Sequence, residues 1–361
     1  MTGTMVAPAG GAGGIDAIAA LSQSDAWGVG SHRPLRKGIY PLTKHWDGKR
    51  WTAVPCPSPG SAAEPVRSYL TAAAIDAPND AWAVGYWSPI EHAAPVYSLI
   101  EHWNGTKWSI VPAPRSPGHA TGGLSAVAAI SPTAAWAFEG GGVLRWDGTR
   151  WRYLPRPPGT GPGTNLSGMA AISARDIWVV GTRLLPHTVD KFRTLAEHWD
   201  GTKWTIVPTP NAFNGQTRNS VLSAVSGSSS GNVWAVGWYQ SGPNGIDHST
   251  LIEHWDGTRW QMQPSPNVRG STAPSQLFAV AALSRTSAWA TGSNYGPVPL
   301  IERWDGRRWT AVPSRLQSHP IFTALDQIFV VNPRDILALG MPALIEKWNG
   351  TTWQQVPNPN P

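Results

Sequence analysis

Short runs of apolar residues recur along the chain, each bounded by turn residues. One repeat unit begins with a run such as LSAVAAIS (124–131), a polar turn and a second run such as DAWAVG (80–85). A stretch of variable length follows, and the unit ends with segments such as LIEHWDGTRW (251–260) and TIVPTP (205–210). Apolar runs of this length between Gly, Pro, Asn and Asp predict β-strands rather than helices.

This unit occurs seven times, and each copy contains four predicted strands, named A to D in chain order. The last two Trp residues of every unit keep the same spacing, as Trp46/Trp51, Trp103/Trp108, Trp146/Trp151, Trp199/Trp204, Trp255/Trp260, Trp304/Trp309 and Trp348/Trp353. Seven such units predict an all-β fold, a seven-bladed β-propeller with four antiparallel strands per blade. Because every unit begins with strand A and ends with strand D, we expect no strand-swapped closure.

The predicted domain organisation follows from these units. A flexible N-terminal segment, 1–14, precedes a single propeller domain, 15–361. The approximate blade boundaries are 15–59, 66–114, 123–158, 166–210, 220–266, 276–314 and 321–361.

Each predicted strand has a recurring feature. Strand A begins at Ile15, Leu70, Leu124, Leu166, Leu222, Leu277 and Phe322, and its third residue is Ala or Gly, which permits close approach near an axis. Strand B carries Trp27, Trp82, Trp136, Trp178, Trp234 and Trp289, with Leu337 in the last unit. We expect these rings to pack between blades. Strands C and D form a hairpin across Asp-Gly or Asn-Gly, with the two Trp as a cross-strand pair.

Composition narrows the range of partners. The formal net charge is +6, but the 28 Lys and Arg are scattered, so we do not expect nucleic-acid binding. Cys56 is the single cysteine and excludes an intramolecular disulfide. The N-terminal sequence lacks the regions of a secretory signal, and no apolar run is long enough to span a membrane. We therefore expect a cytoplasmic monomer, or a secreted one if a leader has been removed from the chain.

The units VWAVG (233–237) and HWDGTKWTIVP (198–208) resemble tectonin-like propeller repeats, and more closely the Trp-rich repeats of many bacterial propeller proteins. The resemblance extends over nearly the whole chain. It implies the propeller fold and, because tectonin-like proteins are often carbohydrate-binding, it places carbohydrates among the expected ligands.

The units differ mainly in the B-to-C stretch, which is long in blades one, two, four and five. The B-to-C and D-to-A connections share one face, here called the top face, because the strands alternate in direction. Twenty of the 22 Trp belong to the repeat, and the other two, Trp87 and Trp238, fall in the long stretches beside Tyr86 and Tyr239. Such rings either stack on a sugar or apolar ligand or pack under their own loops.

The first functional hypothesis is therefore a binding module with one asymmetric site for a glycan or another small or peptide ligand. Its candidate binding residues are Tyr86, Trp87, Trp238, Tyr239, His32 and Tyr40. An alternative is a protein-interaction scaffold without a small ligand.

The second hypothesis is an enzyme, a lyase, hydrolase or cyclase that uses acid–base chemistry. His32, His92, His187 and His248 lie in long B-to-C stretches, and His119 and His319 lie in D-to-A loops. The candidate catalytic residues are His92, His187, His248, Glu91 and Asp247, four of which form the adjacent pairs Glu91-His92 and Asp247-His248. A divalent metal belongs to this hypothesis alone, because no HxH, HExxH or CxxC spacing is present. No other cofactor is expected.

Two further sets of repeat residues are interpreted as structural. The first comprises His45, His102, His198 and His254, which precede the first hairpin Trp. The second comprises Glu101, Glu197, Glu253, Glu302 and Glu346, which recur two positions before that Trp. We expect these glutamates to pair along the sheet rather than to act in catalysis.

Overall fold

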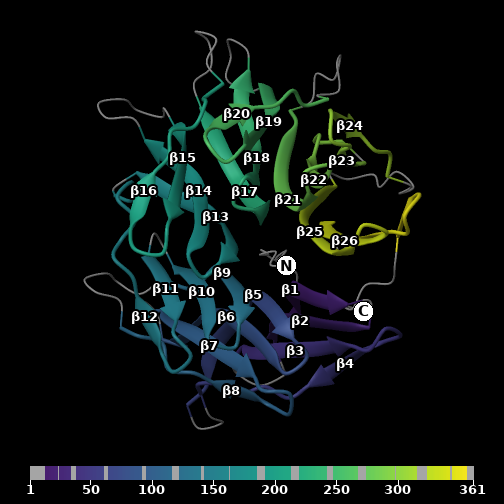
Figure 1. The fold of residues 1–361 in the computed structure, drawn as a ribbon. Helices are drawn as coiled ribbons and strands as arrows, with labels where there is room; N and C mark the ends of the chain where they lie inside the picture. The colour runs from purple at the N-terminus through teal and green to yellow at the C-terminus, as the bar shows by residue number, and fades with distance from the viewer. Residues whose placement is uncertain are drawn as a thin grey trace. The chain divides into compact units, whose positions relative to one another are not determined.

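A computed structural model describes residues 13–22, 24–33, 38–60, 64–91, 95–115, 122–139, 142–161, 163–184, 192–212, 219–241, 247–266, 274–296, 298–314, 323–341 and 344–355. These residues form seven four-stranded antiparallel sheets, each built from four consecutive strands (Figure 1). The fold is an all-β, seven-bladed propeller, as the repeat predicts. No strand is exchanged between sheets in the ranges just given.

The chain divides into two compact units, of which the first ends at Pro155 and the second begins at Arg156. In the first unit, blade 1 contains β1 (Gly13–Ser22), β2 (Asp25–His32), β3 (Tyr40–Trp46) and β4 (Trp51–Val54). Blade 2 contains β5 (Val66–Ala77), β6 (Asp80–Pro89), β7 (Tyr97–Trp103) and β8 (Trp108–Ile110). Blade 3 contains β9 (Ala126–Ser131), β10 (Ala134–Glu139), β11 (Gly142–Trp146) and β12 (Trp151–Tyr153).

The second unit holds four blades. Blade 4 contains β13 (Thr164–Ser173), β14 (Asp176–Leu184), β15 (Phe192–Trp199) and β16 (Trp204–Ile206), and blade 5 contains β17 (Ser220–Ser229), β18 (Asn232–Ser241), β19 (Asp247–Trp255) and β20 (Trp260–Met262). Blade 6 contains β21 (Gln276–Ser284), β22 (Ser287–Ser293), β23 (Pro299–Trp304) and β24 (Trp309–Ala311), and blade 7 contains β25 (Ala324–Asn332), β26 (Asp335–Met341), β27 (Leu344–Trp348) and β28 (Trp353–Gln355). The single domain with the boundaries given above stays a prediction, and most of the 1–14 segment lies outside the described residues.

The strand-B Trp rings pack between neighbouring blades, as predicted. Trp82 of blade 2 is fully buried and contacts both hairpin Trp of blade 3, with ring centroids 5.0 Å from Trp146 and 5.1 Å from Trp151. The same arrangement joins blades 1 and 2, 4 and 5, 5 and 6, and 6 and 7. Because Trp offers a large apolar surface, these contacts form much of the core of each unit.

Every hairpin between the third and fourth strands has the predicted geometry. The two Trp are directly paired, as Trp103 with Trp108, and the Gly between them has a positive φ, 91° at Gly105. The side chain before this Gly accepts backbone hydrogen bonds, since Asn104 Oδ1 lies 3.0 Å from the amides of Thr106 and Lys107. Gly at the left-handed position and Asn or Asp before it therefore specify the turn.

Antiparallel strands give each blade two distinct ends. The connections from first to second strand and from third to fourth strand lie at one end, here named the turn end; in blade 2 these are residues 78–79 and 104–107. The connections from second to third strand and to the next blade lie at the other, named the loop end; in blade 2 the former spans 90–96.

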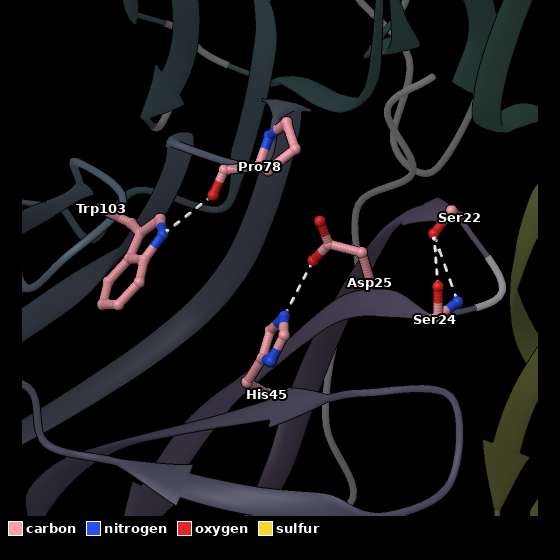
Figure 2. A network of polar contacts seen from close by, with 6 residues as sticks. All are labelled: Ser22, Ser24, Asp25, His45, Pro78 and Trp103. Carbon is pink, nitrogen blue, oxygen red and sulfur yellow. Dashed lines mark hydrogen bonds and ion pairs between the residues drawn. The ribbon is translucent and has the colours of Figure 1, made fainter.

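Side-chain hydrogen bonds close the turn ends. Trp103 Nε1 donates to the Pro78 carbonyl at 3.1 Å, and Trp146, Trp255 and Trp304 make the same bond in their blades. Figure 2 shows the Trp103 bond, together with the His45–Asp25 pair and the Ser22–Ser24 contact of the first turn in blade 1.

The strand boundaries differ from the sequence prediction at the loop end. Strand B was expected to end at the Gly of AVG, but β6 runs past Gly85 to Pro89 and β18 runs past Gly237 to Ser241. The Gly is required by packing within the sheet, because a Cβ on Gly85 would lie 2.0 Å from the Tyr69 carbonyl oxygen. Residues 86–89 and 238–241 are therefore strand rather than loop.

The predicted start of strand A in blade 7 is wrong by three residues. Phe322 lies outside the described residues, and Leu325 pairs with Gly340 as Leu70 pairs with Gly85 in blade 2. The third residue of this strand is therefore Gln327 rather than Ala or Gly. The error arose because the apolar run around Phe322 fits more than one register.

Candidate functional site

The extended strands of blades 1 and 2 carry paired aromatic side chains at their loop ends. In blade 2, Trp87 of β6 is directly opposite Tyr97 of β7, and their rings stack with centroids 4.7 Å apart and an interplanar angle of 25°. In blade 1, His32 of β2 is opposite Tyr40 of β3, with ring centroids 5.9 Å apart. Direct cross-strand pairs place both rings on the same face of a sheet.

A backbone bridge joins the two blades at this point. Ile39, just before β3, pairs with Arg67 of β5: the Ile39 amide donates to the Val66 carbonyl at 3.0 Å, and the Ser68 amide donates to the Ile39 carbonyl at 2.8 Å. Ser68 is in turn opposite Trp87. The bridge therefore brings the strand positions of Tyr40 and Trp87 near each other where blades 1 and 2 meet.

We name His32, Tyr40, Trp87 and Tyr97 the blade 1–2 aromatic cluster. Tyr97 is 40% exposed, and the other three side chains are half-buried. Stacked rings with an exposed face offer apolar area to a ligand at a small cost in side-chain entropy, and the imidazole and phenol groups can hydrogen-bond. The cluster can therefore bind a flat or C–H-rich surface and orient it by polar contacts.

Three predicted binding residues, His32, Tyr40 and Trp87, fall in this cluster, whereas Tyr97 was missed by the sequence reasoning. The signal was available, because Trp87 and Tyr97 are each two residues beyond a pair, Gly85 and Leu99, that the repeat aligns. A register drawn through that pair brings the two rings opposite each other.

Tyr86, also predicted to bind ligand, faces the other way. Its ring stacks on Tyr69 of β5 at 4.9 Å and lies against Gly123, just before β9, where a Cβ would be 2.6 Å from the Tyr86 ring. Burial raises the pKa of Tyr86, with smaller contributions from Tyr69 and from Asp16 of β1. Burial also raises the pKa of Asp16, to about 7. Tyr86 therefore packs toward blade 3, apart from the aromatic cluster.

The predicted residues of the second unit lie in blade 5. Trp238 is in β18 and not in a loop; its ring centroid is 4.2 Å from that of His248 in β19. His248 also hydrogen-bonds through Nδ1 with Gln276 of β21. Tyr239 packs against an apolar cluster formed by residues of blades 4 and 5. His248 thus lies beside an aromatic ring and an amide side chain.

Only some of the residues of the enzyme hypothesis lie in the described part of the chain. His92 and His187 lie outside the described residues, as do His119 and His319. Glu91 is exposed, and for Asp247 only the strand position in β19 is described. Within the described ranges, no group of three or more His, Cys, Asp or Glu is suited to hold a metal ion. The enzyme hypothesis, with its metal, stays a prediction.

The histidines before the hairpin Trp form structural contacts, as expected. His45, His198 and His254 each place Nε2 2.8 Å from an oxygen at the start of the second strand, on Asp25, Asp176 and Asn232 respectively. His102 bonds Asp80 in the same way, and its ring lies 4.2 Å from the Trp82 ring. Each imidazole is thus fixed between a turn-end acceptor and, in these blades, the buried Trp.

The seven blades define the class of protein, an all-β propeller, and similar solved structures agree. The chain is similar to YCF48 bound to D1 peptide, at 12% identity and TM-score 0.56, over 96% of this chain and 99% of that one. It is similar to YCF48 from Cyanidioschyzon merolae, at 14% identity and TM-score 0.57, over 97% and 99% respectively. It is also similar to the GH74 xyloglucanase from Xanthomonas campestris, at 14% identity and TM-score 0.62, over 99% of this chain and 56% of that one.

At these identities the likeness shows the fold alone. No protein-family model matches the chain, and no curated protein matches it. A search of the described residues for helices able to span a membrane finds none.

Proposed function

We propose that the protein is a binding module that holds a glycan, or another small or peptide ligand, at the blade 1–2 aromatic cluster. The observation that carries this proposal is the stacked Trp87–Tyr97 pair, in which Tyr97 is 40% exposed. The strand-B Trp of the repeat, in contrast, are buried between blades. An exposed aromatic ring held rigidly by a second ring is suited to stacking on a sugar or on an apolar side chain.

Two further features support the proposal. His32 and Tyr40, paired on the neighbouring blade, add polar groups, so the cluster combines stacking with hydrogen bonding. The YCF48 structure named above contains a bound peptide, and the tectonin-like resemblance of the repeat favours a carbohydrate. Both ligand classes therefore belong in the first screen.

The test is a screen of glycan and peptide arrays with the wild-type protein and with the Trp87→Ala/Tyr97→Ala double variant. We expect array signals from the wild-type protein that the double variant loses. Tyr295→Ala is the matched control, because Tyr295 is also exposed, at 49%, but belongs to blade 6. Equal signals from wild type and the double variant would contradict the proposal. Absence of any signal from the wild type would favour the protein-interaction scaffold.

A further inference from the structure

The five repeat glutamates of the third strands are completely buried. They are Glu101, Glu197, Glu253, Glu302 and Glu346, each with no solvent-exposed surface. At Glu101 and Glu253 the expectation of pairing along the sheet is wrong. Glu101 is opposite Ala83 on one side and Ile110 on the other, and Glu253 is opposite Ala235 and Met262. The cross-strand neighbours of these two carboxyl groups are therefore apolar.

Glu302 and Glu346 have polar neighbours in the segment that precedes their blade in the chain. Ser265, after β20, places its hydroxyl oxygen 3.0 and 3.1 Å from the two carboxyl oxygens of Glu302 in blade 6. Ser314, after β24, donates to Glu346 of blade 7 at 2.6 Å. The acids at these positions thus connect one blade to the next.

Other groups of the preceding segments lie near Glu101 and Glu197. Cys56 follows β4 and lies close to Glu101 of blade 2. Burial, and to a smaller extent the charge of an ionised Glu101, raise the pKa of the Cys56 thiol to about 12. The Gly159 amide donates to Glu197 at 3.2 Å. Thiol, hydroxyl and amide groups are all neutral here, so none supplies a positive charge.

The hydrogen bonding of these acids is incomplete. In the part of the chain that the structure describes, both carboxyl oxygens of Glu101 and both of Glu253 are buried without a hydrogen-bond partner. An ionised carboxylate without a cation or donors is very unfavourable in such a site, whereas the neutral acid is tolerated. Burial accordingly raises the pKa of Glu101 to about 8 and that of Glu302 to about 7, and raises that of Glu253 well above its usual value.

Blade 3 provides an internal comparison. Its residue two positions before the hairpin Trp is Leu144, and the preceding segment carries Ala113 where other blades have Cys56 or Ser265. Leu144 and Ala113 belong to the same apolar cluster. Where the carboxyl is replaced by an apolar side chain, the group facing it is apolar as well.

We propose that the buried glutamates Glu101, Glu253 and Glu302 are protonated acids at acidic pH, and that their ionisation as the pH rises weakens the packing between successive blades. In the folded protein the proton is retained, whereas in the unfolded chain each carboxyl releases it near its ordinary pKa. Below that ordinary value both states are protonated and the stabilisation is fully present. As the pH rises from there through the raised pKa of the folded state, the stabilisation is lost.

The main experiment measures the free energy of unfolding in urea between pH 4.5 and pH 9 for the wild type and for the Glu101→Gln/Glu253→Gln/Glu302→Gln variant. Gln keeps the shape and has no proton to lose. We expect the unfolding free energy of the wild type to fall as the pH rises. The slope of that dependence gives the number of protons released on unfolding, which should be smaller in the variant by about one per replaced glutamate. Glu91→Gln, at an exposed position, should leave the pH dependence unchanged. A pH dependence that is identical in the wild type and the triple variant would overturn the proposal.

A second measurement covers the case in which the triple variant fails to fold. Carbon-13 resonances of the glutamate carboxyl groups are followed from pH 4 to pH 9 in the wild-type protein. We expect several glutamates to keep the chemical shift of the neutral acid at pH 6, and single Glu→Gln variants assign them. Ionisation of every glutamate near its ordinary pKa would overturn the proposal irrespective of the variants.

Discussion

The two ends of blade 2 use aromatic residues in opposite ways. At the turn end, Trp103 donates its N–H to Pro78, and His102 lies between Asp80 and the buried Trp82 ring. At the loop end, Trp87 and Tyr97 stack on each other, and Tyr97 leaves 40% of its surface in solvent.

The difference separates scaffold from site. Turn-end aromatic residues recur in most blades and are occupied by contacts within or between blades, so their replacement should weaken the fold. The loop-end cluster occurs where β6 extends beyond the repeat, and its exposed ring is available to a ligand. The predictions below test this separation.

The largest effect is expected at Trp82. Its replacement by Ala removes a fully buried ring between blades 2 and 3, so Trp82→Ala should lower the free energy of unfolding by about 3–5 kcal/mol. Chemical denaturation of this variant beside Trp87→Ala gives the comparison, since the half-buried loop-end Trp should cost about 1 kcal/mol or less. Equal losses for the two variants would show that Trp87 is a core residue.

A smaller effect is expected at Gly85, where β6 passes from the repeat into its extension. A Cβ there would lie 2.0 Å from the Tyr69 carbonyl oxygen, so Gly85→Ala should destabilise the protein by about 1–3 kcal/mol as the strands are forced apart. Gly161→Ala is the control, because a Cβ at Gly161 meets nothing within 4 Å. Thermal unfolding of both variants decides the matter, and a neutral Gly85→Ala would contradict the close approach of the two strands.

The smallest effect on stability is expected at a single turn-end hairpin. Asp200 Oδ1 accepts from the Thr202 hydroxyl at 2.6 Å and from the amides of Thr202 and Lys203 at 2.8 and 3.0 Å, and these bonds lower the pKa of Asp200, to about 2. Asp200→Ala should destabilise the protein by less than Gly85→Ala does. Asp200→Asn, which keeps an acceptor, should recover most of that loss in the same denaturation experiment. Equal losses for Asp200→Ala and Asp200→Asn would show that the acceptor at position 200 does not stabilise the turn.

Sequence reasoning predicted the repeated parts of the fold well because their signals are local. The Trp pairs, the Asp-Gly or Asn-Gly turns and the strand-B Trp identify the blades without reference to distant contacts, and the structure confirms their roles. The register of blade 7 failed at Phe322, where neighbouring apolar residues permit several alignments and only pairing with Gly340 selects Leu325.

The candidate site was predicted in part, for a related reason. Trp87 was correctly separated from the repeat, but Gly85 was taken as the end of its strand, which placed Trp87 in a loop and hid its pairing with Tyr97. The bridge between Ile39 and Arg67 joins blade 1 to blade 2, so its two residues belong to different repeat units. Such contacts between blades cannot be read from a repeat considered one copy at a time.

The most direct test of the account is the dissociation constant of the best array ligand for the Tyr97→Ala variant. Loss of the exposed stacking ring should weaken binding by about tenfold or more, which corresponds to about 1.4 kcal/mol, while the unfolding free energy stays close to that of the wild type. Tyr295→Ala, measured beside it, should bind as the wild type does. An unchanged dissociation constant for Tyr97→Ala would contradict the assignment of the blade 1–2 aromatic cluster as the binding site.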